Sequence, residues 1–152
     1  IRDVVPSGNM HRETDEMWSL LRDRHRTAIH LVALPEELPI LETVELHEEL
    51  TETLGLPLGA ILLNRYPTAP FGPKAGDAFT QLPIPPKESG LREHWEIAQI
   101  GLRRAQKAQA HYDTLAGLGR PVIKLSEKVG IDLTREGLNE LVGELTAMDT
   151  AR

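Results

Sequence analysis

The sequence predicts an α/β fold in which a mainly parallel sheet is flanked by helices. Two short apolar runs, residues 28–34 and 59–64, are typical of buried strands, and an amphipathic segment from about Pro39 to Leu54 lies between them. A strand, a helix and a second strand form a βαβ unit, whose strands run parallel through a right-handed crossover. We place this unit at about 28–64 and treat residues 1–152 as a single domain fragment.

Each part of this unit has its own signal. The run from Ala28 to Leu34 is continuously apolar and ends at Pro35, which predicts a strand buried on both faces. The helix gathers its apolar residues on one arc and its glutamates on the opposite one, and Gly55 is expected to end it. The apolar arc consists of Ile40, Val44, Leu46, Leu50 and Leu54, and the acidic arc of Glu42, Glu45, Glu49 and Glu52.

Residues 65–88 contain six prolines and two glycines, so we expect no regular element there but a long loop, either a functional lid or disordered. A long helix is predicted at about 89–116, followed by a last strand at 121–125 and a last helix at about 134–147. The long helix repeats apolar residues at alternating steps of four and three, with Gln109 as the one interruption: Leu91, Trp95, Ala98, Leu102, Ala105, Tyr112 and Ala116. The last helix should turn Leu138, Leu141, Val142 and Leu145 inward.

Composition excludes several classes of function. A net charge of −6 provides no field that attracts nucleic acid, and no apolar run is long enough to cross a membrane. The absence of cysteine excludes disulfides and thiolate zinc sites and favours a reducing compartment, so we expect a cytoplasmic protein. Because residue 1 is Ile, we also expect that further polypeptide precedes it.

The common motifs for phosphate, zinc and acyl-transfer sites do not occur in the sequence. His47-Glu48 lacks the second histidine of a zinc motif, and its place on the helix indicates a partly buried structural histidine. A basic cluster, Arg22, Arg24, His25 and Arg26, precedes the first strand, and we interpret it as a solvated turn.

Asn64 is the main candidate for binding. Ligands of parallel sheets lie outside the carboxyl ends of the strands, and Asn64 is the polar residue that closes an apolar strand there. Its carboxamide matches the N6 and N7 edge of adenine, although an asparagine in this place is also a common turn former. The turn at Pro35, Glu36 and Glu37 lies at the equivalent end of the first strand, so both strand ends should border one crevice.

Three stretches of this sequence resemble the arsenite-pump, or ArsA-type, ATPase family, which includes the ATPases that chaperone tail-anchored membrane proteins. They are a Thr-led strand ending in Pro-Glu (27–36), a Glu-Thr-x-x-Leu-like helix segment (41–46) and a strand ending in Asn (61–65). Residues 103–112 and 122–125 are similar to the long basic helix and the last strand of that family.

The resemblance implies the latter half of a deviant P-loop NTPase fold. It also implies ATP or ADP with Mg²⁺ as cofactor, with the phosphate and metal ligands outside this chain, and a homodimer or a paired ATPase subunit. Metalloid or membrane-protein cargo would belong to the full protein. Asn64 corresponds to the adenine-contacting Asn of the family. Ser126 stands where the family usually has a Pro that lines the base pocket.

From the sequence we therefore expect the C-terminal portion of an ArsA-type ATP-hydrolysing protein, an anion-transporting or targeting ATPase. The chain would contribute the adenine side of the ATP site, through Pro35, Glu36, Asn64 and Ser126, and a dimer surface. It contains no identifiable catalytic or metal-binding residue, so it should not hydrolyse ATP alone. The alternative is a non-catalytic interaction module that binds another protein through the long helix and the Pro-rich loop.

Overall fold

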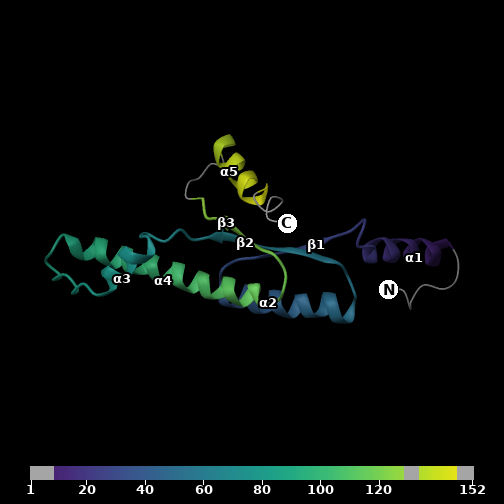
Figure 1. Ribbon diagram of the computed structural model, residues 1–152, viewed down its shortest axis with the longest axis horizontal. Helices are drawn as coiled ribbons and strands as arrows, with labels where there is room; N and C mark the ends of the chain where they lie inside the picture. The colour runs from purple at the N-terminus through teal and green to yellow at the C-terminus, as the bar shows by residue number, and fades with distance from the viewer. Residues whose placement is uncertain (1–8, 129–133, 147–152) are drawn as a thin grey trace.

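The computed structural model describes residues 9–128 and 134–146 and confirms an α/β architecture, with three parallel strands flanked by helices. Figure 1 shows an elongated molecule, with the first helix at one end, the sheet in the middle and a helical arm at the other end. The elements in chain order are α1 (Asn9–Arg22), β1 (Ile29–Ala33), α2 (Glu37–Glu48), the π-helical turn η2 (Glu49–Thr53), β2 (Leu58–Tyr66), α3 (Pro73–Thr80), α4 (Leu91–Ala116), β3 (Val122–Ser126) and α5 (Arg135–Thr146).

The sheet has the order β1-β2-β3, and both neighbouring pairs are parallel. The expected βαβ pairing is confirmed, because Leu31 and Ala33 of β1 pair with Ile61 and Leu63 of β2. Helices α2 and α4 lie along one face of the sheet and α5 lies on the other side (Figure 1). The carboxyl ends of the strands point toward α3, and their amino ends point toward α1.

The hydrophobic core lies between the sheet and the layer formed by α2 and α4. Leu63 in β2 and Leu115 in α4 are both 0% exposed, and Ile61 is almost as deeply buried. Leu31 and Ala33 join them from β1, and Ile40 joins them from α2. Since side chains alternate along a strand, these buried residues of β1 and β2 all belong to the face that the helices cover.

The expectation that the first strand is buried on both faces is wrong. Exposed and buried residues alternate along the strand. Val32 is 62% exposed and His30 is also exposed, whereas Leu31 and Ala33 are buried. The physical reason is the coverage of the second face: α5 contacts β3, where Ile123 is buried, and leaves β1 open. The continuous apolar run therefore predicts the strand correctly, but it does not show that residues of this chain cover both of its faces.

The molecule exposes much more surface than a compact protein of its mass. Its accessible surface is 11,458 Å², against roughly 7,700 Å² for a compact monomer of 16.9 kDa. Large apolar side chains account for part of it and lie on all of the longer helices, among them Met17, Leu38, Leu41, Leu91, Ile97, Ile100, Leu138, Val142 and Leu145. The fold thus leaves apolar surface on both ends of the molecule and on the second face of the sheet.

The helix after β1 ends as the sequence predicted. Helix α2 continues into η2, and Gly55 follows with a φ of 62°, a backbone conformation that glycine adopts without strain. The predicted apolar arc holds only in part, because Ile40 is buried and Val44 and Leu50 pack against the core, whereas Leu46 is exposed. His47 is half-buried, as expected for a structural histidine.

The Pro-rich segment is not devoid of regular structure, which corrects the prediction for 65–88. Strand β2 extends to Tyr66, and α3 begins at Pro73, where the first turn of a helix tolerates proline. Helix α3 packs closely on α4, since a Cβ on Gly76 would lie 3.3 Å from Leu102 Cδ1. The ring of Phe79 lies 5.0 Å from that of Phe71 and 5.9 Å from that of Trp95, between centroids, so aromatic packing holds this segment together.

The long helix and the last helix also depart from their predicted apolar stripes. The buried residues of α4 are Ala108 and Leu115, neither of which belongs to the predicted series, and Leu91 is exposed. The predicted stripe fails because only the second half of α4 reaches the sheet, so only that half can be buried against the core (Figure 1). Helix α5 leaves its apolar residues largely exposed, and residue 147, its predicted end, lies outside the described residues. Helix α1 was not predicted.

Replacing Leu63 with Ala should lower the free energy of unfolding by about 2–5 kcal/mol, because it opens a cavity where no neighbour is free to fill it. Val32→Ala is the matched control on the neighbouring strand, since its side chain faces solvent and should cost less than about 1 kcal/mol. Urea unfolding followed by circular dichroism measures both. Equal losses in the two variants would contradict the one-sided core.

Limited trypsin digestion should cut after Lys87 before it cuts after Lys74. Lys87 is exposed and lies outside the helices, whereas Lys74 lies in the first turn of α3, whose backbone must unfold locally to enter a protease. Mass spectrometry of early fragments identifies the first cut, with Lys107 in the middle of α4 as the protected reference. Early cleavage at Lys74 would show that α3 does not persist in solution.

Candidate functional site

The carboxyl edge of the sheet, defined here as the strand ends with the residues that directly follow them, brings the predicted site residues to one side of the molecule. Tyr66 at the end of β2 pairs with Ser126 at the end of β3, and Asn64 lies two residues before Tyr66. Pro35 and Glu36 follow β1, whose last residue pairs with Leu63. Parallel pairing therefore brings all four predicted residues toward the same end of the sheet, although β2 continues through Asn64 to Tyr66 and does not end at Asn64 as predicted.

Asn64 has a structural contact of its own. Its side-chain Oδ1 accepts a hydrogen bond from the Arg65 backbone N–H at 2.9 Å. Arg65 has a φ of 55°, a left-handed conformation that is strained for a residue with a Cβ, and the register between β2 and β3 shifts at this point. Asn64 thus stabilises a bulge at the end of β2. Its side-chain NH₂ group has no hydrogen-bond partner in the described part of the chain.

Glu127 connects three elements at this edge. Its Oε1 lies 3.3 Å from Arg65 Nη2 and its Oε2 lies 3.2 Å from Arg104 Nη2 of α4. Its backbone N–H donates to the Tyr66 carbonyl at 2.8 Å. The carboxylate is 16% exposed while both arginines are open to water, so each ion pair contributes little energy but fixes the geometry of the strand ends.

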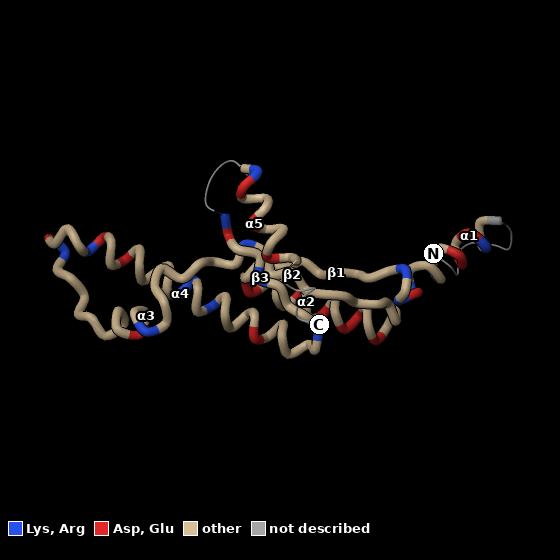
Figure 2. Tube along the Cα trace, turned by 45° about the horizontal axis from the view of Figure 1, so that its top comes forward, with Lys and Arg blue, Asp and Glu red and all other residues tan. Residues whose placement is uncertain are grey.

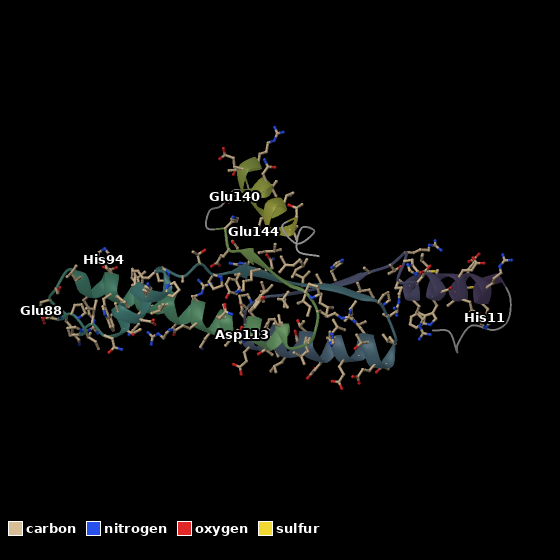
Figure 3. All side chains as sticks on the ribbon, viewed as in Figure 1. His11, Glu88, His94, Asp113, Glu140 and Glu144 are labelled. Atoms are coloured by element: carbon tan, nitrogen blue, oxygen red, sulfur yellow. The ribbon has the colours of Figure 1, made fainter. Side chains whose placement is uncertain are left out.

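Ser126 is held by helix α5. Its backbone N–H and its hydroxyl donate to the two carboxylate oxygens of Glu144, at 2.9 and 2.6 Å. Lys128 lies 2.6 Å from Glu140 and 3.9 Å from Glu144 (Figure 3 shows both glutamates on α5). Burial alone would raise the pKa of Glu144, but the two Ser126 hydrogen bonds and the charge of Lys128 together lower it. The Lys128 pKa is raised, chiefly by its hydrogen bond to Glu140.

A second polar group lies on the helix side of the same edge. Lys124 Nζ lies 3.9 Å from the ring centroid of Tyr112 and 4.5 Å from that of Tyr66, and it donates to Gln109 Oε1 at 2.8 Å. The Tyr66 hydroxyl donates to the same oxygen at 3.0 Å. Gln109, the interruption in the predicted apolar series of α4, is therefore the acceptor that satisfies both groups.

The side chains of Pro35 and Glu36 make no hydrogen bond with any described residue. Pro35 is half-buried, and Glu36 is exposed at the start of α2, where its side chain makes no capping hydrogen bond. The Glu36 backbone N–H donates to the Leu34 carbonyl at 2.8 Å and closes the turn that ends β1.

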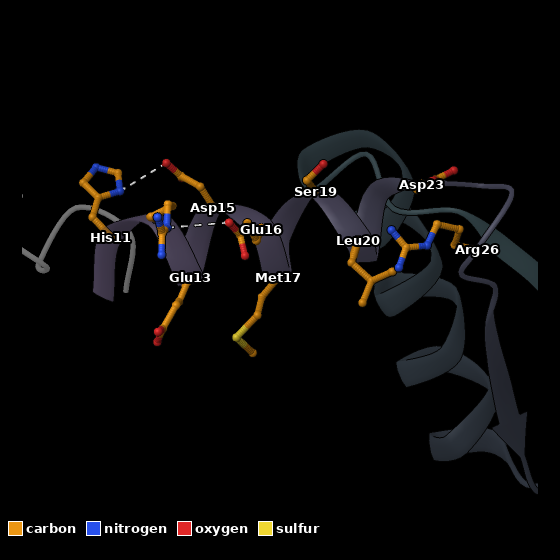
Figure 4. Close-up of a pocket in the computed structure, with 10 residues that line it drawn as sticks. His11, Glu13, Asp15, Glu16, Met17, Ser19, Leu20, Asp23 and Arg26 are labelled. Atoms are coloured by element: carbon orange, nitrogen blue, oxygen red, sulfur yellow. Dashed lines mark ion pairs between the residues drawn. The ribbon is translucent and has the colours of Figure 1, made fainter. Parts of the chain in front are cut away.

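Two pockets of the structure differ in where they lie relative to the carboxyl edge. One of about 450 Å³ is lined by Tyr66, Phe71, Leu102, Gln109, Lys124 and neighbouring residues, so it borders the carboxyl edge from the helix side. Another, of about 1,080 Å³, is lined only by α1 and the turn that follows it (Figure 4). Four of its charged residues pair with each other along the helix, His11 with Asp15 and Arg12 with Glu16, and do not converge on a ligand.

Comparison with known proteins adds a partial match. No protein-family model matches the chain. The ATPase BagA of Mycobacterium tuberculosis strain H37Rv is 40% identical over 65 residues, which is 43% of this chain and 18% of that protein. Proteins of Mycobacterium bovis and of a second Mycobacterium tuberculosis strain, whose names also class them as ATPases, match to the same extent.

The chain is related in part to ATPases. The match spans less than a fifth of the length of these relatives, so it supports an ATPase-related function without extending their whole activity to this chain. No helix in the described ranges 9–128 and 134–146 is long and apolar enough to cross a membrane.

Sequence reasoning missed Arg65, Arg104 and Glu127 as a connected group. No signal in the sequence links them, because Arg104 and Glu127 are separated by the turn after α4 and the whole of β3. The role of Gln109 as a hydrogen-bonding residue could have been predicted, since a polar residue that interrupts an apolar series needs a partner there.

Acidification should loosen the contact between α5 and β3. Because the folded state lowers the pKa of Glu144 below its ordinary 4.5, its carboxylate stabilises the contact above that pH, and this contribution is lost as pH falls through the folded value. Hydrogen exchange of the Ser126 amide, corrected for intrinsic rate from pH 6 to 3, reports this directly. Glu144→Gln should remove the pH dependence and Glu140→Gln should keep it; the same profile in both variants would refute the role of Glu144.

Proposed function

We propose that this chain is the C-terminal portion of an ArsA-type ATP-hydrolysing protein and supplies the adenine side of its nucleotide site. The observation that carries the proposal is Asn64: its carboxamide NH₂ is unpartnered, at the carboxyl edge of a parallel sheet, in a chain partly similar to ATPases. In an ATPase of this kind, bound ATP with Mg²⁺ supplies the reacting phosphates, and their ligands lie outside this chain.

The residues of this edge fit an adenine base. The Asn64 NH₂ group donates to adenine N7, and its oxygen, which keeps a lone pair beside the Arg65 N–H, accepts from the N6 amino group. Ser126 is engaged by Glu144, so it serves as a wall of the base site and not as a donor. Pro35 and Glu36 border the site from the end of β1.

The remaining features of the proposal follow from the surface. The apolar side chains exposed on α2 and α4 provide surface for a homodimer or for a paired ATPase subunit. An anion-transporting or protein-targeting role belongs to the complete protein, as does its metalloid or membrane-protein cargo. The absence of cysteine from all 152 residues suits a reducing compartment, and we propose a cytoplasmic location.

One observation favours the alternative, a non-catalytic interaction module. Leu82 and Ile84 in the segment after α3, and Leu91, Ile97 and Ile100 in the first half of α4, are all exposed on the arm that projects beyond the sheet (Figure 1). A protein partner would bury them. The two functions differ in whether the full-length protein prefers adenine nucleotides.

Two substitutions of Asn64 separate base recognition from the structural role. In the full-length gene product, Asn64→Ala should weaken ATP binding by about 1–3 kcal/mol and lower stability, because it removes the donors and the acceptor for Arg65. Asn64→Asp keeps that acceptor, so it should retain stability while the ratio of ATP to GTP affinity falls, since a carboxylate prefers the N–H groups of guanine. Calorimetric titration and thermal unfolding measure both properties. An unchanged affinity ratio in both variants would remove Asn64 from the nucleotide site and leave only its role in the bulge.

A further inference from the structure

The amino-terminal edge of the sheet carries a basic pocket that the proposed function does not use. It has a volume of about 450 Å³ and is lined by Arg22, Arg24 and Arg120 together with Thr51 and the backbone segment 55–58. Arg22 ends α1, Arg24 lies in the turn that follows, and Arg120 lies just before β3. Two arginines of the basic cluster that was predicted to be a solvated turn are therefore joined by Arg120, almost a hundred residues away, which only the fold brings there.

No ion pair with a described residue neutralises the positive charges of this pocket. Arg22 donates two hydrogen bonds to the Leu54 carbonyl, at 2.8 and 3.1 Å, and Arg120 donates to the Leu58 carbonyl at 3.1 Å. Both acceptors are neutral groups. The Arg24 side chain makes no hydrogen bond or ion pair with any residue that the structure describes.

No carboxylate enters the lining of the pocket as the described residues form it. Asp23 is the nearest acidic residue in sequence, and its Oδ1 accepts the His25 backbone N–H at 2.9 Å. Figure 2 shows basic positions in blue at the connection between α1 and β1, beside the start of the sheet. In a chain of net charge −6, three unneutralised arginines around one hollow are a local reversal of sign.

Two of the three cations are held in place before any ligand arrives. The carbonyl bonds fix the ends of Arg22 and Arg120, and the guanidinium carbon of Arg22 also lies 4.7 Å from the centroid of the Trp18 ring. Positioned side chains lose less conformational entropy on binding, which raises affinity for an anion. The remaining N–H groups of these guanidiniums have no acceptor among the residues that the structure describes and can donate to a ligand.

We propose that this pocket binds a small phosphate-bearing anion. A carboxylate has two oxygens and one charge, which a single arginine satisfies, whereas a phosphate monoester has three terminal oxygens and close to two charges, which suit three guanidiniums. The volume is that of a small-molecule site. The pocket lies at the opposite end of the strands from Asn64, so it is distinct from the adenine site.

Inorganic phosphate is the probe, titrated into the 152-residue chain at low salt and followed by heteronuclear NMR. We expect saturable binding below about 10 mM that weakens as salt increases, and at least about a tenfold loss in Arg24→Gln, the scale of a lost hydrogen bond to a charged group. The Arg24 side chain makes no hydrogen bond or ion pair in the described part of the chain, so this variant should fold normally. Arg103→Gln is the matched control, because Arg103 lies on α4 outside the pocket and its side chain, among the described residues, bonds only to Gln99.

Arg120→Gln is the second variant, checked by circular dichroism because it also removes the bond to Leu58. Asn64→Ala should leave phosphate binding unchanged, which keeps this test separate from that of the nucleotide site. The proposal is overturned by an absence of saturable phosphate binding, by equal losses in Arg24→Gln and Arg103→Gln, or by tighter binding of malonate than of phosphate. Binding of an acidic peptide without binding of phosphate would assign the pocket to a protein partner instead.

Discussion

The buried apolar cluster that Leu63 in β2 shares with Leu115 in α4 is the contact between layers on which the rest of the structure depends. Both side chains are inaccessible to solvent, and they join the central strand to the longest helix. Because α4 is fixed there, it also brings Arg104 and Gln109 to the carboxyl edge, where they meet Glu127 and Lys124. The polar groups of the candidate site thus rely on an apolar contact that lies beneath them.

Burial on one face is the second constraint. The sheet has a dry face under α2 and α4 and a second face that α5 covers only beside β3. The resulting excess of exposed apolar surface is costly for a protein in water and is typical of surfaces that become covered by other polypeptide. This property suits both the proposed role within an ATPase and the alternative role as an interaction module, so surface alone does not separate them.

The two edges of the sheet differ in how their charges are satisfied. At the carboxyl edge, Glu127 and Glu144 accept bonds from side chains of three elements, so these two carboxylates form a closed network, and the Asn64 NH₂ group beside them has no partner among the described residues. At the amino edge, the arginines bond only to carbonyl groups or to nothing in the described part of the chain. A closed network is suited to positioning a neutral base, and uncompensated cations are suited to holding an anion.

The local pattern of the sequence determined the elements of the core. Three local signals were sufficient to predict β1, α2 and β2: the apolar runs, the spacing typical of a parallel strand pair, and Gly55. Each signal comes from residues that lie close together in the sequence. The parallel pairing then placed Pro35, Glu36, Asn64 and Ser126 at one edge, which is a consequence of topology. Helix α3 escaped prediction because its stability comes from Phe79 and Trp95, which pack across two helices.

Tertiary structure alone decided which faces are buried and which charges meet. An apolar side chain such as Val32 looks the same in sequence as its neighbour Leu31. Leu31 is buried because α2 and α4 cover its face of the sheet, and Val32 is exposed because α5 covers the other face only beside β3. In the same way Glu127 gains two arginines, and Arg120 joins Arg22, through contacts between residues distant in the chain. The sequence by itself determined the elements and their order, since those depend on local periodicity, while burial and charge pairing depend on which elements pack together.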